Sequence, residues 1–92
     1  MFYDPASVRL QSPGIYRVWE RLEFNRPDAN GQSFTLGLVE ISCRAETTRS
    51  VQTTAYDRNG RVLATDTSYV APTVAAPGTI ARSLLQAICG GN

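Results

Sequence analysis

The last stretch of the sequence, residues 77–89, constrains the fold most, because it has the pattern of one short amphipathic helix. At about 100° per residue its apolar side chains fall within an arc of roughly 140°, which must pack on another element. Those side chains are Ile80, Ala81, Leu84, Leu85 and Ile88. Thr79 is suited to cap the N-terminus of the helix, and Gly90 to end it. The sequence therefore predicts one helix over residues 79–89 that covers part of the remaining chain.

The chain has two cysteines, Cys43 and Cys89. Cys89 lies in the last turn of the predicted helix, and Cys43 ends the strand-like residues 38–43. They form either a disulfide or, as is common in a cytosolic protein, two free thiols. We favour the disulfide, because both cysteines end periodic elements and nothing in the sequence suggests metal or redox chemistry. Closing a loop of about 46 residues stabilises the folded state by ~4 kcal/mol in the chain-entropy model.

Residues 15–24 form the longest segment that alternates with period 2. One face is mostly apolar and is the better candidate for the core: Tyr16, Val18, Glu20, Leu22 and Phe24. The other face carries Ile15, Arg17, Trp19, Arg21 and Glu23. A strand in this segment therefore buries its even-numbered side chains.

Other segments show shorter strand patterns, and turn residues separate them. The strand-like segments are 7–11, 34–44, 51–57 and 62–69; the connections are 26–32, 44–48 and the hairpin signal at 58–61. Because strands and helices do not alternate, a parallel sheet is disfavoured. We therefore predict a single α+β domain over residues 1–92. Its antiparallel sheet has about five or six strands, and the C-terminal helix packs on one face.

Composition excludes several classes of function. A net charge of +1 gives no electrostatic case for binding nucleic acid or an anionic membrane. The absence of histidine and lysine removes the commonest general bases and the commonest metal ligand. Glu20 and Glu23, the nearest pair of carboxylates, fall on opposite strand faces. We therefore expect no enzyme, no cofactor and no metal site.

Two sequence features bear on location. No apolar run approaches the roughly 18 residues that a membrane-spanning helix needs, so we expect no integral span. The first residues lack the cationic start and the apolar stretch of a secretory signal. A secreted location thus requires that a signal segment has been removed from the sequence.

Arg17, Trp19 and Arg21 alternate on one strand face and form the candidate binding face. Two guanidinium groups beside an indole suit stacking on a ligand or contact with an acidic protein partner. In the more ordinary interpretation, the arginine stems cover a half-buried tryptophan on an outer sheet face. We favour this second interpretation, because the net charge is close to neutral.

Several segments resemble, in order, the surface-adhesin protein E family of proteobacterial envelope domains. They are residues 3–8, 16–19, 39–44, 70–72 and 77–89. The most specific parts are the pattern Glu-Ile-x-Cys-Arg at 40–44 and the Pro-Gly-Thr start of a helix that ends in Cys89. The resemblance covers nearly the whole chain.

The resemblance implies an antiparallel sheet with a C-terminal helix, a disulfide between Cys43 and Cys89, and a secreted or lipid-anchored location. The family's named member is an adhesin that binds host extracellular-matrix proteins and forms dimers, so a homodimer is also implied. The expected function is a non-enzymatic binding module in the periplasm or on the outer-membrane surface that recognises a protein or matrix partner. The alternative is a structural or assembly component that contacts other bacterial envelope proteins.

Overall fold

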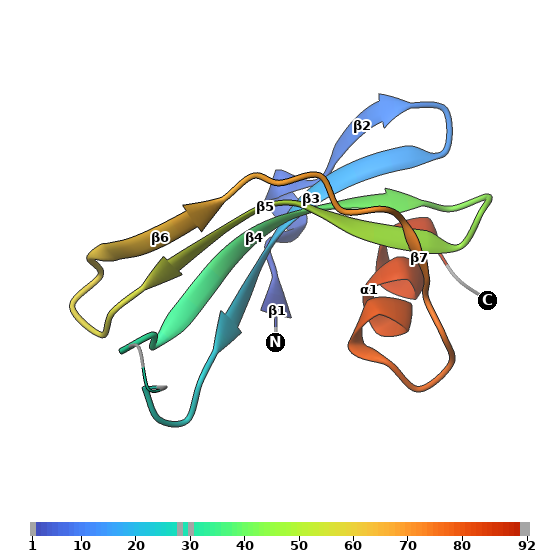
Figure 1. Cartoon of the computed structure of the whole chain (residues 1–92). Coiled ribbons are helices and arrows are strands. Elements are labelled where there is room, and N and C mark those ends of the chain that lie inside the picture. The colour runs from blue at the N-terminus through green and yellow to red at the C-terminus, as the bar shows by residue number, and fades with distance from the viewer. Residues whose placement is uncertain (1, 28, 30, 91–92) are drawn as a thin grey trace.

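A computed structural model of the chain describes residues 2–27, 29 and 31–90. Within these residues it contains seven β-strands, one short 3-10 helix and one α-helix (Figure 1). In chain order they are β1 (Phe2–Tyr3), η1 (Pro5–Ser7), β2 (Arg9–Ser12), β3 (Ile15–Glu23), β4 (Phe34–Ser42), β5 (Thr47–Tyr56), β6 (Val62–Asp66), β7 (Thr73–Val74) and α1 (Ile80–Cys89).

All seven strands belong to one antiparallel sheet. Strands β3 to β6 follow one another as a meander; β1 and β2 pair with the free edge of β3, and β6 and β7 pair with the same edge of β5. The predicted fold class, an antiparallel sheet with one C-terminal helix pinned by a disulfide, is confirmed. The two-residue strands β1 and β7 lie outside the predicted strands, because two residues are too few to show an alternation.

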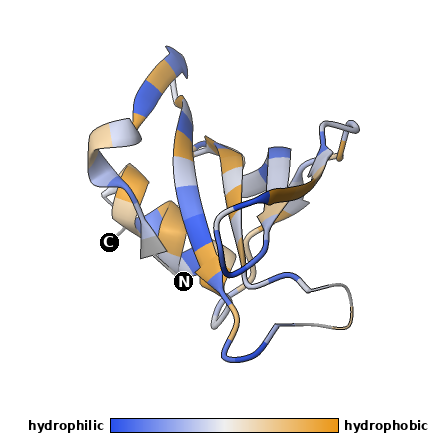
Figure 2. Ribbon diagram, turned by 90° about the vertical axis from the view of Figure 1, so that its left-hand side faces the viewer, coloured by the Kyte–Doolittle hydropathy of each residue, from blue (hydrophilic) through white to orange (hydrophobic). Residues whose placement is uncertain are grey.

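The side chains of strand β3 alternate between the two faces of the sheet, as the sequence pattern predicts. Val18 is fully buried and lies opposite Val39, and the next inward pair is Tyr16 and Ile41. We call this side, which α1 covers, the inner face (Figure 1). The outer face is the opposite side of β3, β4 and β5, and it carries Arg17, Trp19 and Arg21. Figure 2 shows hydrophilic and hydrophobic residues alternating along the strands.

Helix α1 forms the second layer. The hydroxyl of Thr79 accepts a hydrogen bond from the backbone N–H of Arg82 at 3.1 Å, which confirms the predicted cap, and Gly90 ends the helix with a φ of 71°. Leu84 and Leu85 are buried against the inner face. Burying each of two such side chains stabilises the fold by ~1.5–3 kcal/mol. The helix thus closes the core together with the two strands at the centre of the sheet.

The disulfide between Cys43 and Cys89 is present, as predicted, and joins the last residue of α1 to the chain directly after β4. The turn between β4 and β5 contacts the first turn of the helix, at the end opposite the disulfide. There Glu46, with a φ of 57°, accepts a backbone hydrogen bond from Ala75, and its carboxylate lies 2.6 Å from the guanidinium of Arg82. The helix is therefore fixed to the sheet by one covalent bond and by one ion pair.

Several details of the prediction are wrong. Leu22, expected on the buried face of its strand, is 38% exposed, because α1 covers the other end of the inner face. The strand predicted over residues 7–11 begins only at Arg9, because Ser7 belongs to η1.

Ile80 was expected in the core but is 56% exposed, because a hollow of about 120 Å³ separates the first turn of α1 from the inner face. Strand β5 begins at Thr47, within the predicted connection 44–48, since its first four residues are polar and show no hydrophobic alternation. Strand β6 ends at Asp66 rather than residue 69. The carboxylate of Asp66 accepts the backbone N–H of Ser68, and this turns the chain out of the sheet.

Candidate functional site

The three residues of the candidate binding face lie side by side on the outer face. In the register of β3 and β4, Arg17, Trp19 and Arg21 are opposite Glu40, Leu38 and Leu36, respectively. Trp19 is 37% exposed. The structure therefore brings the predicted residues together, and their role in binding stays a prediction.

The backbone of Trp19 is held from the edge of the sheet. Its carbonyl oxygen accepts the N–H of Asp4 at 3.0 Å, and its N–H donates to the hydroxyl of Ser7, also at 3.0 Å. Asp4 in turn caps η1, because its carboxylate accepts the N–H of Ala6. Both polar groups that Trp19 directs at this edge are thus satisfied, which fixes the strand where the indole is displayed.

Arg17 belongs to a bridge of three charges across three strands. The carboxylate of Glu40 on β4 lies 3.4 Å from the Nε of Arg17 on β3 and 2.6 Å from the Nε of Arg49 on β5. The side chains are between 18% and 31% exposed, so solvent screens these pairs less than it would screen a fully exposed pair. Glu40 thus holds both guanidinium groups against the sheet.

Arg21 is held by a carboxylate and by an aromatic ring. Its Nε lies 2.6 Å from Glu23, and its guanidinium lies over the ring of Phe34, 4.0 Å from the centroid. The ring of Phe34 stacks on Tyr56, with 4.8 Å between centroids. Such a cation–π contact contributes ~0.5–1 kcal/mol at an exposed position. This row runs across the outer face at the end of the sheet farther from α1.

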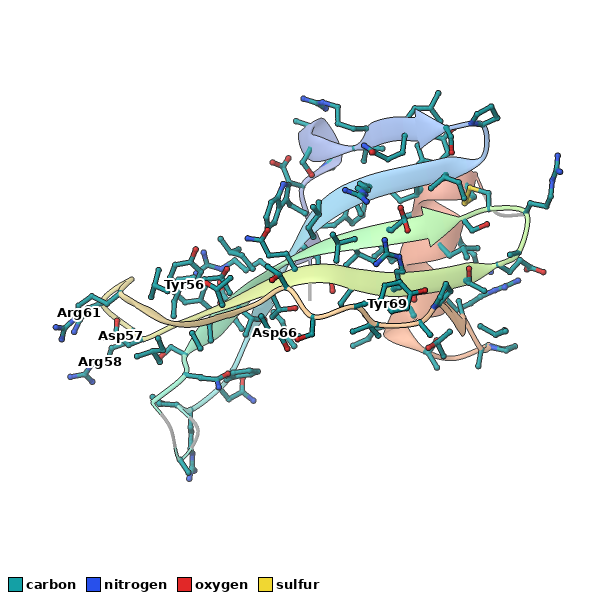
Figure 3. All side chains as sticks on the ribbon, turned by 45° about the horizontal axis from the view of Figure 1, so that its top comes forward. Tyr56, Asp57, Arg58, Arg61, Asp66 and Tyr69 are labelled. Atoms are coloured by element: carbon teal, nitrogen blue, oxygen red, sulfur yellow. A yellow bond between two sulfur atoms is a disulfide. The ribbon has the colours of Figure 1, made fainter. Side chains whose placement is uncertain are left out.

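The segment that follows β6 adds one more aromatic residue. Tyr69 is 76% exposed, and its ring centroid lies 5.3 Å from the guanidinium carbon of Arg49. Figure 3 turns the outer face toward the viewer and shows Tyr69 beside β5, with α1 behind the sheet. No described helix or strand lies over this face. Aromatic and arginine side chains are therefore displayed together on an uncovered surface.

Sequence reasoning found three residues of this surface and missed four. Glu40, Arg49, Phe34 and Tyr69 come from other strands or from a connection. A pattern along one strand identifies the residues of a face, but it does not give the register of the neighbouring strand. A pairing of β3 with β4 set by the buried Val18 and Val39 would have placed Glu40 beside Arg17.

Two hollows open on the outer face. One, of about 250 Å³, is lined by Asp4, Trp19, Glu20, Arg21 and Leu36. The other, of about 330 Å³, is lined by Ile15, Glu40, Ser42, Ala45, Thr47, Thr48, Arg49 and Pro72. The first hollow lies beside Trp19 and Arg21 of β3, and the second lies over β4 and β5 near Ile15, at the start of β3.

Among the residues that the structure describes, three carboxyl groups have pKa values displaced from the ordinary range, and none of the three belongs to the outer face. Burial raises the pKa of Glu20, on the inner face. Hydrogen bonds from the backbone N–H groups of Arg61 and Asn59 lower the pKa of Asp57, and the backbone N–H of Ser68 lowers that of Asp66. The two aspartates therefore stabilise turns through these hydrogen bonds. Figure 3 shows Asp57 near the tip of the β5–β6 hairpin.

The described residues contain no group of three or more histidine, cysteine, aspartate or glutamate side chains placed to hold a metal ion. The one helix in residues 2–27, 29 and 31–90 is too short to cross a bilayer.

Comparison with known proteins identifies a family. The family model for surface-adhesin protein E matches residues 1–90. No curated protein and no solved structure gives a significant match. The match spans almost the entire chain and includes the sheet, the helix and both cysteines. The chain therefore belongs to the surface-adhesin protein E family.

Proposed function

We propose that this protein is a non-enzymatic binding module, secreted or exposed at the cell envelope, which recognises a protein partner through its outer face. The family match supports adhesion in general. The observation that carries the choice of surface is the exposed group of Trp19, Arg21 and Tyr69, with the partly buried Arg49 beside Tyr69. Tryptophan, tyrosine and arginine are the residues that contribute most to protein interfaces.

The ion pairs of this face favour binding over a merely covering role. Because Glu40 and Glu23 already hold the guanidinium groups in place, little side-chain entropy is lost when a partner docks. The disulfide supports an oxidising location, since such bonds persist outside the cytosol. The partner is then a host matrix protein or a component of the bacterial envelope.

In the test, the oxidised domain is immobilised, and the proteins that it captures are measured. Two pools are offered to it: a panel of purified extracellular-matrix proteins and an envelope extract of the source cell. We expect Trp19→Ala to weaken capture at least about tenfold, because central aromatic anchors dominate interface energy. The matched control is Ile80→Ala, which removes an exposed apolar side chain from the opposite side of the sheet.

Circular dichroism and the unfolding midpoint show whether each variant is folded. If Trp19→Ala is destabilised, Arg17→Gln gives the same test, because Glu40 keeps its shorter contact with Arg49. Equal capture by all variants would show that the outer face is not the binding surface. Saturable capture from the matrix panel supports an adhesin, whereas capture of one envelope component identifies an assembly part.

A further inference from the structure

The two hollows on the outer face indicate what kind of ligand the surface takes. Pockets for small molecules commonly measure ~300–1,000 Å³ and enclose most of the ligand. The hollows here, of about 250 and 330 Å³, are near or below the lower limit and open on a sheet surface. Each is suited to a single side chain of a larger partner rather than to a cofactor or a metabolite.

The first hollow is apolar. The indole of Trp19 and the side chain of Leu36 contribute to a lining that is almost entirely carbon, and Arg21 stands at its side. The guanidinium of Arg21 is held between Glu23 and Phe34, so it does not turn into the hollow and occupy it. A large aliphatic or aromatic side chain gains most from burial there.

The second hollow also has a lining that is mostly carbon, but it lies beside the charge bridge, with Glu40 and Arg49 in its wall. Arg17 and Arg49 each direct Nε to Glu40, and the described contacts give their terminal Nη atoms no polar partner. Because two guanidinium groups surround one carboxylate, the bridge has a net positive charge. A second carboxylate, supplied by a partner, can accept from the Nη atoms in the geometry that guanidinium groups favour.

The spacing of the hollows follows from strand geometry. The first hollow is at the level of Trp19 and Arg21 on β3, and the second is over β4 and β5 at the level of Ile15, which pairs with Ser42. Four residues of a strand rise ~13 Å, and side chains two or four positions apart point to the same side. Because the second hollow lies over β4 and β5, an extended peptide that crosses β3 and β4 obliquely reaches both hollows with side chains four positions apart.

We propose that the outer face reads an extended segment of the partner that places a large apolar side chain in the Trp19 hollow and an acidic side chain, four positions away, against Arg17 and Arg49. This inference rests on the proposed function and specifies the chemistry of its partner. The charge balance of the bridge argues for the acidic group, and the carbon lining of the first hollow argues for the apolar one.

Trp19 is the single tryptophan of the chain, so its fluorescence reports directly on the first hollow. Four capped peptides without aromatic residues are titrated into the oxidised domain. One carries leucine and glutamate four positions apart on a Ser/Thr backbone. The second has them three positions apart, the third replaces glutamate with lysine, and the fourth replaces leucine with serine.

We expect the first peptide to bind at least about tenfold more tightly than each of the others, because each loses one anchor. In the protein, the substitution Arg49→Gln should weaken the binding of the first peptide by a similar factor. The matched control Arg58→Gln, at the exposed tip of the β5–β6 hairpin, should leave it unchanged (Figure 3).

Equal binding of all four peptides, or of none, overturns the inference. A sulfated oligosaccharide that changes the fluorescence when no peptide does would overturn it in favour of a glycan ligand. Neither result touches the proposed function, which is tested by capture of whole proteins. Conversely, loss of that capture with intact peptide selectivity would overturn the proposed function alone.

Discussion

Glu20 occupies the inner face of β3 although its side chain is ionisable. It lines the hollow under the first turn of α1, together with Val39, Ile80 and Leu84. Burial raises the pKa of its carboxyl above the ordinary value of 4.5. The raised pKa means that the folded state binds this proton more tightly than the unfolded chain does. The stability that protonation supplies is fully present below pH 4.5, and it is lost as the pH rises through the higher folded value.

We therefore expect Glu20→Gln to be more stable than the wild type at pH 7, with a difference that disappears as the pH falls below 4.5. Urea unfolding of both proteins between pH 4 and pH 7 measures it. The lowered pKa values of Asp57 and Asp66 act in the opposite sense, since their contribution is lost on acidification. They are common to both proteins and cancel in the difference. A difference independent of pH would contradict the assignment to the charge of Glu20.

Two glycines make a matched pair for testing backbone conformation. Gly37 in β4 has no positive φ, and a Cβ there would lie 3.7–3.9 Å from its nearest neighbours, an ordinary contact. Gly37→Ala should stabilise the domain by ~0.5–1 kcal/mol, since alanine restricts the unfolded chain. Gly60, at the hairpin tip, has open space around it but a φ of 83°. Gly60→Ala should destabilise by ~1–2 kcal/mol. Thermal unfolding that shows the same sign for both would contradict this reasoning.

At the scale of elements, the disulfide decides how firmly α1 stays on the sheet. The bridge spans 46 positions of sequence, and a loop of that size is worth up to ~4 kcal/mol in the chain-entropy model. We expect Cys43→Ser and the double variant Cys43→Ser/Cys89→Ser to lose ~2–4 kcal/mol of unfolding free energy without reductant. Denaturant midpoints measure this loss. Adding reductant should bring the wild type to the level of the double variant; a wild type unaffected by reductant would contradict the proposed contribution.

The elements that could be predicted are those with a strong local period or a special residue. Helix α1 was predicted from its apolar arc, its Thr79 cap and Gly90, and all three are present. Strand β3 was predicted from alternation alone. The first part of β5, by contrast, consists of threonine, arginine and serine, and it pairs with β4 because of the turn at Glu46, not because of its own hydrophobic pattern. The pairing with β4 determines where this part of β5 forms, and no local sequence pattern indicates it.

The candidate site was predicted to the extent that it lies on one strand. Alternation along β3 placed Arg17, Trp19 and Arg21 on one face, and the structure agrees. Arg49 lies opposite Glu40 in the register that the turn between β4 and β5 sets. Farther from this turn, β5 carries a bulge opposite Leu38 and Val39, and the bulge shifts the register in which Tyr56 comes to lie opposite Phe34. The full surface therefore depends on an irregularity that the sequence does not mark.

At the scale of the molecule, the two faces of the sheet differ in their side chains and in what covers them. Helix α1 covers the end of the inner face that carries Val39 and Ile41, and this end contains the core. The outer face contributes aromatic and charged side chains that contact one another across the strands. Because core and candidate binding surface lie on opposite sides of β3, substitutions on the outer face should affect recognition more than folding. This separation is what makes the capture experiment informative.

The position of the disulfide also determines how the domain carries mechanical load. Tension on the chain beyond Cys89 passes through the sulfur atoms to Cys43 and enters the sheet at the end of β4. Strands β5, β6 and β7 and helix α1 lie inside the covalent loop and are bypassed by the force. The stretched part of the domain is then the set of strands from β1 to β4, whose paired hydrogen bonds include the region that displays Trp19. The candidate binding surface on β3 and β4 is thus connected covalently, through the disulfide, to the last residue of α1.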